Sequence, residues 1–278
     1  SPYHGFSVEF AEHRAYNTGE STRHIDWKLY ARSDKMFVKR FEEDTNLRCQ
    51  ICIDRSGSMF YPKATDEIHS NKIGFSIQAA ASLVYLMRSH RDAVGVTLFG
   101  DGIEWSTPAK SNSAHHNYLF QELEKEFNKQ EGASTSNIVS SLHKIAEMVH
   151  KRSLIVIFSD FVDSVFINDE AQTELFEALQ HLRYNKHEVV LFHVFDKKTE
   201  LNLDLENRPY TFVDLETGEQ VKVNPNEVRE QYSAMRNKKV ADVKLRCRQF
   251  GIDWVETDIE EPVDKVLERF FAKRARMR

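Results

Sequence analysis

The 278-residue chain has 41% hydrophobic residues and three cysteines, so it has enough apolar residues for a large core and too few cysteines for a disulfide scaffold. Its 38 Lys and Arg against 43 Asp and Glu give a formal net charge of −5, which provides no general attraction to nucleic acid or anionic lipid. No uninterrupted apolar run of about eighteen residues occurs, so we expect no membrane segment in this chain.

Residues 1–46 are polar, charged and aromatic, without a long apolar periodicity. Acidic residues such as Asp26 and Glu42 stand among basic residues such as Arg14 and Arg23, so internal ion pairs would hold a small layer with little core. The interleaved aromatic residues are also typical of a nucleic-acid surface. We favour the structural interpretation, because the acidic residues would repel phosphate.

From residue 47 onward, apolar runs of strand length alternate with amphipathic stretches of helix length. This alternation predicts a mostly parallel sheet with right-handed crossovers and helices on both faces. The predicted strands are 47–54, 93–99, 103–106 at an edge, 153–160, 188–195 and 252–255. The predicted helices are 68–90, 115–127, 138–150, 170–182, 226–250 and 262–273.

A β-hairpin interrupts this alternation at about 196–225, where segments 210–214 and 219–223 have strand character. We therefore predict two parts, an amino-terminal segment over 1–46 and an α/β domain over 47–278 that carries the hairpin. We expect the amino-terminal segment and the hairpin to pack together as a small β-rich satellite.

Oxygen-bearing side chains follow two of the predicted strands. Asp54, Ser56 and Ser58 come directly after the first strand, and Asp160 ends the strand of residues 153–160. Carboxyl ends of parallel strands meet at one edge of a sheet, so we expect these side chains to converge there. Carboxylates and hydroxyls are hard donors that suit Mg²⁺ or Ca²⁺ better than zinc.

This Asp-x-Ser-x-Ser pattern resembles the metal-ion-dependent adhesion site (MIDAS) of von Willebrand factor A domains. The preceding segment resembles the bacterial family called domain of unknown function 58, through Arg14, Tyr16, Gly19, Asp26-Trp27 and Ala31-Arg32. Glu20 departs from the Asp that is common in that family. The resemblance implies a von Willebrand factor A-like, doubly wound α/β fold.

The resemblance also implies a set of metal ligands. Asp54, Ser56 and Ser58 would surround one Mg²⁺, with Mn²⁺ or Ca²⁺ as other possible ions, and Asp160 would act through water. A loop over 132–137 would add one hydroxyl. Alignment favours Ser136, whereas Thr135 has the residue type expected but lies one position earlier.

Such a site leaves one coordination position for an Asp or Glu carboxylate of a partner protein, which is binding and not catalysis. Because the resembled family is frequently encoded beside MoxR-type AAA+ ATPases, we expect a cytoplasmic adaptor for such an ATPase and no enzyme activity.

Two alternatives stay open. One is a magnesium-dependent phosphoester hydrolase that uses Asp54 and Asp160, although Ser56 stands where haloacid-dehalogenase-type phosphatases carry a second acid. The other is purely structural, with Ser56 and Ser58 capping a helix and Asp54 accepting hydrogen bonds at a strand end.

The cysteines are interpreted as structural. Cys49 and Cys52 have the spacing of a redox pair, but positions an odd number apart point to opposite faces of a strand. Together with Cys247 on a predicted helix, we expect them to be buried or half-buried thiols in a reducing cytoplasm.

Overall fold

The computed structural model describes residues 7–17, 22, 25–44, 47–63, 71–129, 137–161, 169–206, 208–213 and 220–276. By its internal contacts, the chain divides into two units, Ser1–Leu47 and Arg48–Arg278. Within the described ranges, no helix is both long and apolar enough to cross a membrane.

The first unit contains an antiparallel pair of strands, β1 (Ser7–Ala15) and β2 (Phe37–Asp44), with helix α1 (Trp27–Ser33) between them in sequence. The pairing shifts between Phe10 and Glu12, which marks an irregularity of the β-bulge type. These elements were not predicted individually, because their residues lack the alternation that marks a half-buried strand.

Helix α1 begins at a side-chain cap. The carboxylate of Asp26 accepts hydrogen bonds of 3.0 Å from the backbone N–H groups of Lys28 and Leu29. Ile25, directly before the cap, is buried, whereas Trp27, directly after it, is 59% exposed. Asp26 therefore stabilises the helix start, which is a local role that its neighbouring charges did not reveal.

The second unit is organised around a six-stranded sheet in the order β10-β7-β6-β3-β4-β5. All neighbouring strands are parallel except β5, which pairs antiparallel with β4 at the edge. This doubly wound order is that of a von Willebrand factor A-like domain and confirms the predicted fold class. The strands are β3 (Arg48–Asp54), β4 (Ala93–Phe99), β5 (Ile103–Ser106), β6 (Leu154–Ser159), β7 (Glu188–Phe195) and β10 (Asp253–Asp258).

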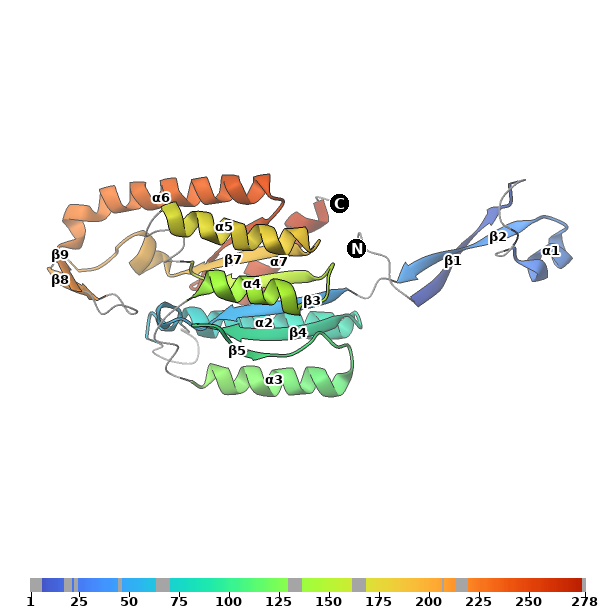
Figure 1. Cartoon of the computed structure of the whole chain (residues 1–278), viewed down its shortest axis with the longest axis horizontal. Helices are drawn as coiled ribbons and strands as arrows, with labels where there is room; N and C mark the ends of the chain where they lie inside the picture. The colour runs from blue at the N-terminus through green and yellow to red at the C-terminus, as the bar shows by residue number, and fades with distance from the viewer. Residues whose placement is uncertain are drawn as a thin grey trace. The chain divides into compact units, whose positions relative to one another are not determined.

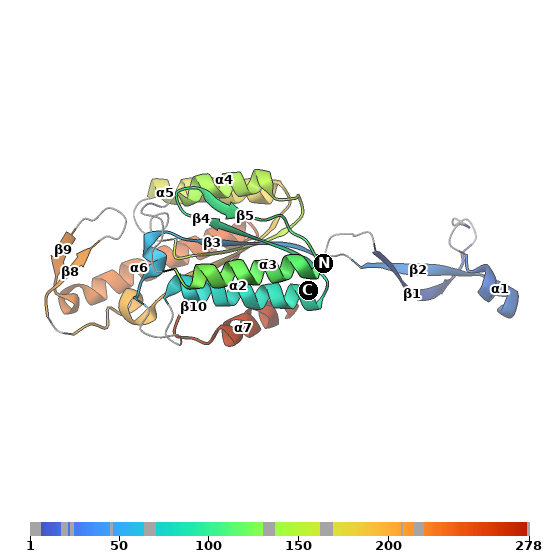
Figure 2. The same ribbon diagram turned by 90° about the horizontal axis from the view of Figure 1, so that it is seen from below.

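Helices cover both faces of this sheet, as Figure 1 and Figure 2 show together. Helices α2, α3 and α7 lie on one face, whereas α4, α5 and α6 share a hydrophobic core on the other. Their bounds are α2 (Lys72–Ser89), α3 (Ser113–Phe127), α4 (Ile138–Met148), α5 (Asp169–Tyr184), α6 (Pro225–Gln249) and α7 (Val263–Arg276).

The central strands are apolar along their length because both of their faces are covered. Every residue of β4 and β6 is buried, and in β3 only Arg48 is exposed. Parallel strands between two helical layers have no solvent face, so they carry continuous apolar runs in place of alternation. The same burial makes a polar residue at the end of such a strand conspicuous.

A hairpin of β8 (Tyr210–Val213) and β9 (Gln220–Val223) forms between β7 and α6, close to the predicted strand bounds. It belongs to the second unit. Its packing with the amino-terminal segment stays a prediction. A short π-helix, η4 (Lys197–Leu201), follows β7 and was not predicted. The hairpin lies at the end of the unit where the parallel strands finish (Figure 1).

Helix α2 begins later than predicted. Residues 68–70 of the prediction lie outside the described residues, and the helix starts at Lys72 after Asn71, whose side chain accepts a 2.9 Å hydrogen bond from the Gly74 N–H. This cap places Lys72 in the first turn of a helix that is buried for most of its length.

Candidate functional site at the carboxyl edge of the sheet

Asp54 is the last residue of β3 and is only 2% exposed. One carboxylate oxygen, Oδ1, accepts a 2.9 Å hydrogen bond from the Ser56 N–H. The other, Oδ2, accepts a 2.6 Å hydrogen bond from the Ser159 hydroxyl at the end of β6. The neighbouring strands β3 and β6 thus hold this carboxylate in one orientation.

Ser56 and Ser58 follow on a tight turn into the short 3₁₀-helix η2 (Gly57–Phe60). Their hydroxyl oxygens lie 3.1 Å apart, and Ser56 is 1% exposed. Ser56 occupies the cap position of η2, but its side chain makes no capping hydrogen bond. The capping role considered from the sequence is therefore not what this hydroxyl does, because it faces Ser58.

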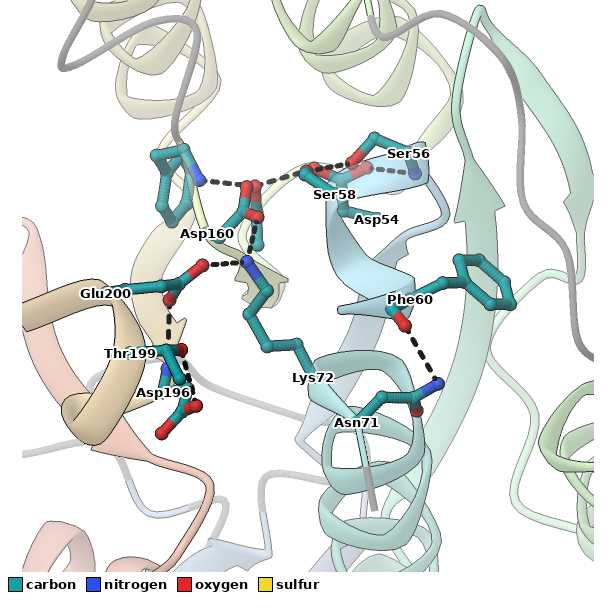
Figure 3. A network of polar contacts seen from close by, with 12 residues as sticks. Asp54, Ser56, Ser58, Phe60, Asn71, Lys72, Asp160, Asp196, Thr199 and Glu200 are labelled. Carbon is teal, nitrogen blue, oxygen red and sulfur yellow. Dashed lines mark hydrogen bonds and ion pairs between the residues drawn. The ribbon is translucent and has the colours of Figure 1, made fainter. Parts of the chain in front are cut away.

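Asp160 follows β6 and is 3% exposed. Figure 3 shows Asp160 at the same edge as Asp54, and its carboxylate is close enough to raise the pKa of Asp54. Four of the five predicted site residues therefore lie at one edge of the sheet: Asp54, Ser56, Ser58 and Asp160. The fifth, Ser136, and its alternative Thr135 lie outside the described residues.

Helix α4 begins next to the sheet, directly after Asn137. The Asn137 N–H donates a 3.0 Å hydrogen bond to the Gly100 carbonyl, which directly follows β4. The Asn137 side chain then caps α4 by accepting from the Ser140 N–H at 3.0 Å. Helix α4 thus begins at the carboxyl end of β4, which is the strand next to β3.

A lysine that sequence reasoning missed completes the described cluster. Lys72 is 1% exposed, and its ammonium group lies 2.7 Å from Asp160 Oδ2 and 2.6 Å from Glu200 Oε1 (Figure 3). The second oxygen of Glu200 accepts a 2.9 Å hydrogen bond from the Asp196 N–H. Lys72 therefore connects α2, the end of β6 and η4.

These contacts shift the pKa values of Asp54 and Lys72. Burial and the nearby Asp160 carboxylate raise the pKa of Asp54 to about 6, although hydrogen bonds from Ser159 and Ser56 oppose the rise. Burial lowers the pKa of Lys72, but Asp160 and Glu200 outweigh it and leave the pKa above its usual value. The ammonium group therefore stays charged at neutral pH.

The two serine hydroxyls are within hydrogen-bonding distance of each other, and their spacing also matches that of two neighbouring ligands of a small divalent cation. Two adjacent ligands of an octahedral Mg²⁺, each about 2.1 Å from the ion, lie about 3.0 Å apart, and the two serine oxygens are separated by 3.1 Å. Among the described residues, no three His, Cys, Asp or Glu side chains gather into a metal-binding group. Any ion here would therefore depend on the hydroxyls as well as on Asp54.

Comparison with known protein families shows the family to which the chain belongs. The family model described as protein of unknown function DUF58 matches residues 12–242. The chain belongs to the DUF58 family. Its curated relatives include Uncharacterized protein Rv1480 of Mycobacterium tuberculosis and Uncharacterized protein Mb1516 of Mycobacterium bovis, each 22% identical over 161 residues. That match covers 58% of this DUF58 chain and 49% of each relative, so the aligned part spans about half the length of these relatives.

Two solved structures resemble this chain over most of its length. Conserved hypothetical protein BatB from Bacteroides thetaiotaomicron is 17% identical with a TM-score of 0.46, and the match covers 83% of this DUF58 chain and 99% of BatB. The SpRpn10 VWA domain is 10% identical with a TM-score of 0.42, covering 81% and 95% of the two chains.

Proposed function

We propose that this DUF58 protein is a protein-binding module that works through an adhesion-type divalent-cation site. The observation that carries the proposal is the placement of the Ser56 and Ser58 hydroxyls, 3.1 Å apart, next to the buried Asp54 carboxylate. Asp160 follows the neighbouring strand β6, and an adhesion-type site requires a carboxylate at that place. The von Willebrand factor A-like fold supports a role in protein interaction.

In this proposal the residues of the chain hold the ion and leave one position open. Asp54 supplies one negative charge, and Ser56 and Ser58 supply neutral oxygens, with Ser136 or Thr135 as the predicted fourth donor. A bound Mg²⁺, or Mn²⁺ or Ca²⁺, would supply a Lewis-acidic centre for a carboxylate of the partner. Because two of the donors carry no charge, the ion remains attractive to an incoming Asp or Glu.

We further propose that the partner is a MoxR-type AAA+ ATPase, or a client that this module brings to such an ATPase. This step depends on the family resemblance alone and is an analogy. The buried free thiols Cys49, Cys52 and Cys247 support a reducing compartment such as the cytoplasm.

Calorimetric titration of Mg²⁺, Mn²⁺ and Ca²⁺ into the wild type and Asp54→Ala tests the site. We expect one saturable site in the wild type and none in Asp54→Ala. Asp54→Ala should also fail to capture the partner, and so should the wild type when a chelator is present. Lys125→Met, which removes an exposed ion pair on α3, is the matched control. Partner capture that ignores both the chelator and Asp54→Ala would exclude this mechanism.

The phosphoester hydrolase remains the second candidate, because two strand-end carboxylates, Asp54 and Asp160, lie at the same edge. Against it, Ser56 stands two residues after Asp54, where haloacid-dehalogenase-type phosphatases carry a second acid. We therefore place this protein among binding modules and not among enzymes. Turnover of a generic phosphoester that disappears in Asp54→Asn would reverse that choice.

A further inference from the structure

We propose that Lys72 is an internal counter-cation that weakens divalent-cation binding at the neighbouring Asp54–Ser56–Ser58 site. This inference rests on the proposed metal site and adds a residue that opposes it. The sequence marks Lys72 only as a residue within the predicted helix over 68–90. The evidence is its burial, its two carboxylate partners and the position of one of them.

The first step is the burial of the ammonium group. Lys72 is 1% exposed, and the side chain of Asp160 is 4% exposed, so this ion pair lies almost entirely out of water. A buried charge without partners is strongly unfavourable, whereas a buried pair that is also hydrogen-bonded is tolerated. Lys72 is therefore stable in this position only because Asp160 and Glu200 are beside it.

The second step concerns Asp160. In the proposed site this carboxylate would face the ion through a water molecule, but its Oδ2 atom is already 2.7 Å from the Lys72 ammonium group. An oxygen that shares its charge with an ammonium group attracts a second cation less strongly. Lys72 also repels any divalent cation that enters next to Asp160, since both are positive.

The third step is the anchoring of Glu200. This residue lies in η4, and its second oxygen accepts from the Asp196 N–H at 2.9 Å. The Asp196 carboxylate in turn accepts from the Thr199 hydroxyl at 2.6 Å and from the Lys198 N–H at 3.0 Å. Glu200 is thus held in place, and it keeps the ammonium group of Lys72 directed at Asp160.

The consequence is a site that binds its ion weakly on its own. The Lys72 ammonium group lies between two carboxylates, Asp160 and Glu200, and Asp160 is the one that adjoins Asp54. Removing that ammonium takes a positive charge away from Asp160 Oδ2, so a divalent cation next to Asp160 meets less repulsion and more attraction. In the wild type, a carboxylate from a partner protein would supply the missing negative charge, which couples ion binding to partner binding.

The test compares the wild type with Lys72→Met, which keeps the length of the side chain and removes its charge. We expect the dissociation constant for Mg²⁺, measured by calorimetry, to fall by about tenfold or more. In chelator the melting temperature should fall, and Mg²⁺ should restore it by a larger shift than in the wild type. Lys125→Met removes a 2.6 Å pair on the surface of α3 and should change neither quantity.

If Lys72→Met fails to fold, Lys72→Gln takes its place, because glutamine keeps a hydrogen-bond donor for Asp160 and removes the charge. Glu200→Gln is the measurement with the opposite expected sign. It leaves Lys72 paired with Asp160 alone and removes one negative charge, so Mg²⁺ should bind more weakly than in the wild type. A residue that merely stabilises the fold would weaken ion binding in both variants. Opposite signs in Lys72→Met and Glu200→Gln support the inference, and weaker or unchanged binding in Lys72→Met overturns it.

The outcomes separate this inference from the proposed function. If Mg²⁺ binding to the wild type is lost in Asp54→Ala but unchanged in Lys72→Met, this inference is overturned and the proposed function stands. Saturable binding in Lys72→Met without any in the isolated wild type supports the inference. The proposed function is then overturned only if partner capture by the wild type is also indifferent to chelator. An absence of binding in every variant overturns both.

Discussion

The Ser159 hydroxyl donates a 2.6 Å hydrogen bond to Asp54 Oδ2, which joins the ends of two neighbouring strands, β6 and β3. The same hydroxyl oxygen accepts a 3.0 Å hydrogen bond from the Phe161 N–H. One serine therefore orients the carboxylate of the candidate site and also satisfies the backbone where the chain leaves β6. Ser159 is fully buried, so no water can replace it.

Ser159→Ala should destabilise the protein by about 1–3 kcal/mol, because it leaves a buried carboxylate oxygen and a buried N–H without this partner. It should also raise the pKa of Asp54 further, since this hydrogen bond favours the charged form. Chemical denaturation at several pH values measures both effects. Ser82→Ala, which removes a hydroxyl bonded only to the Gln78 carbonyl within α2, is the control and should cost much less.

Acidification should change the stability in the direction set by Asp54. Its pKa is about 6 in the folded protein against an ordinary value of 3.8, so the folded state holds the proton more tightly than the unfolded chain. The contribution of Asp54 to the free energy of unfolding is therefore favourable at low pH and is lost as the pH rises from about 4 through 6. Two pKa units correspond to about 3 kcal/mol.

Asp54→Asn isolates this contribution, because the variant cannot titrate at that position. Measured in chelator, the stability of the wild type relative to Asp54→Asn should fall between pH 4 and pH 7. A difference that stays constant over this range would contradict the raised pKa. Divalent cations need the ionised carboxylate, so their binding to the wild type should weaken below about pH 6.

Gly95→Ala should be strongly destabilising, although the position is a strand interior where alanine is ordinarily accepted. A Cβ atom at Gly95 would lie 2.5 Å from both Gln50 Oε1 and the Thr107 carbonyl, and 2.9 Å from the Ala109 nitrogen. Overpacking of this kind costs about 1–3 kcal/mol or more. Thermal unfolding measures the loss.

The double variant Gly95→Ala/Gln50→Ala should recover little of that loss. Of the three nearest atoms, one belongs to the Gln50 side chain, while those of Thr107 and Ala109 are backbone atoms, which yield less easily than a side chain. Gln50 itself donates to Thr97 Oγ1 at 2.9 Å and to the Thr107 carbonyl at 3.0 Å, so its removal has a cost of its own. Full recovery would show that the backbone gives way.

The three thiols should not react in the folded protein. Cys49, Cys52 and Cys247 are all buried, and burial raises the pKa of Cys49 and of Cys247 to about 12. At pH 8 about one thiol in ten thousand would be ionised at such a pKa. A thiol-specific reagent should therefore label no cysteine in native buffer and all three in guanidinium, whereas fast native labelling would revive a redox role for Cys49 and Cys52.

The large features of the fold were predictable because they depend on local pattern. Apolar runs such as 93–99 and 188–195 predicted buried parallel strands, and their order predicted that Asp54 and Asp160 would meet at one edge. The amino-terminal elements were missed, because β1 and β2 show no clean alternation and α1 is short. Asp26 before Trp27 was the available signal for the helix cap.

The polar contacts around the candidate site were not predictable in the same way. Lys72 is 88 residues from Asp160 and 128 residues from Glu200 in the chain. A lone lysine at the start of a helix is ordinarily exposed, so its sequence position gives no indication of a buried pair. The π-helix that carries Glu200 has no simple sequence pattern either, and only the folded chain brings these charges together.

The burial of Lys72 has a consequence for the response of the molecule to salt. Sodium or potassium ions screen the exposed Lys125–Glu122 pair on α3, so its strength changes with the medium. The Lys72 ammonium group is part of the chain and excluded from water, so dilution cannot remove it and bulk ions hardly reach it. The positive charge that Lys72 places at this edge of the sheet is therefore nearly independent of the salt concentration around the folded protein.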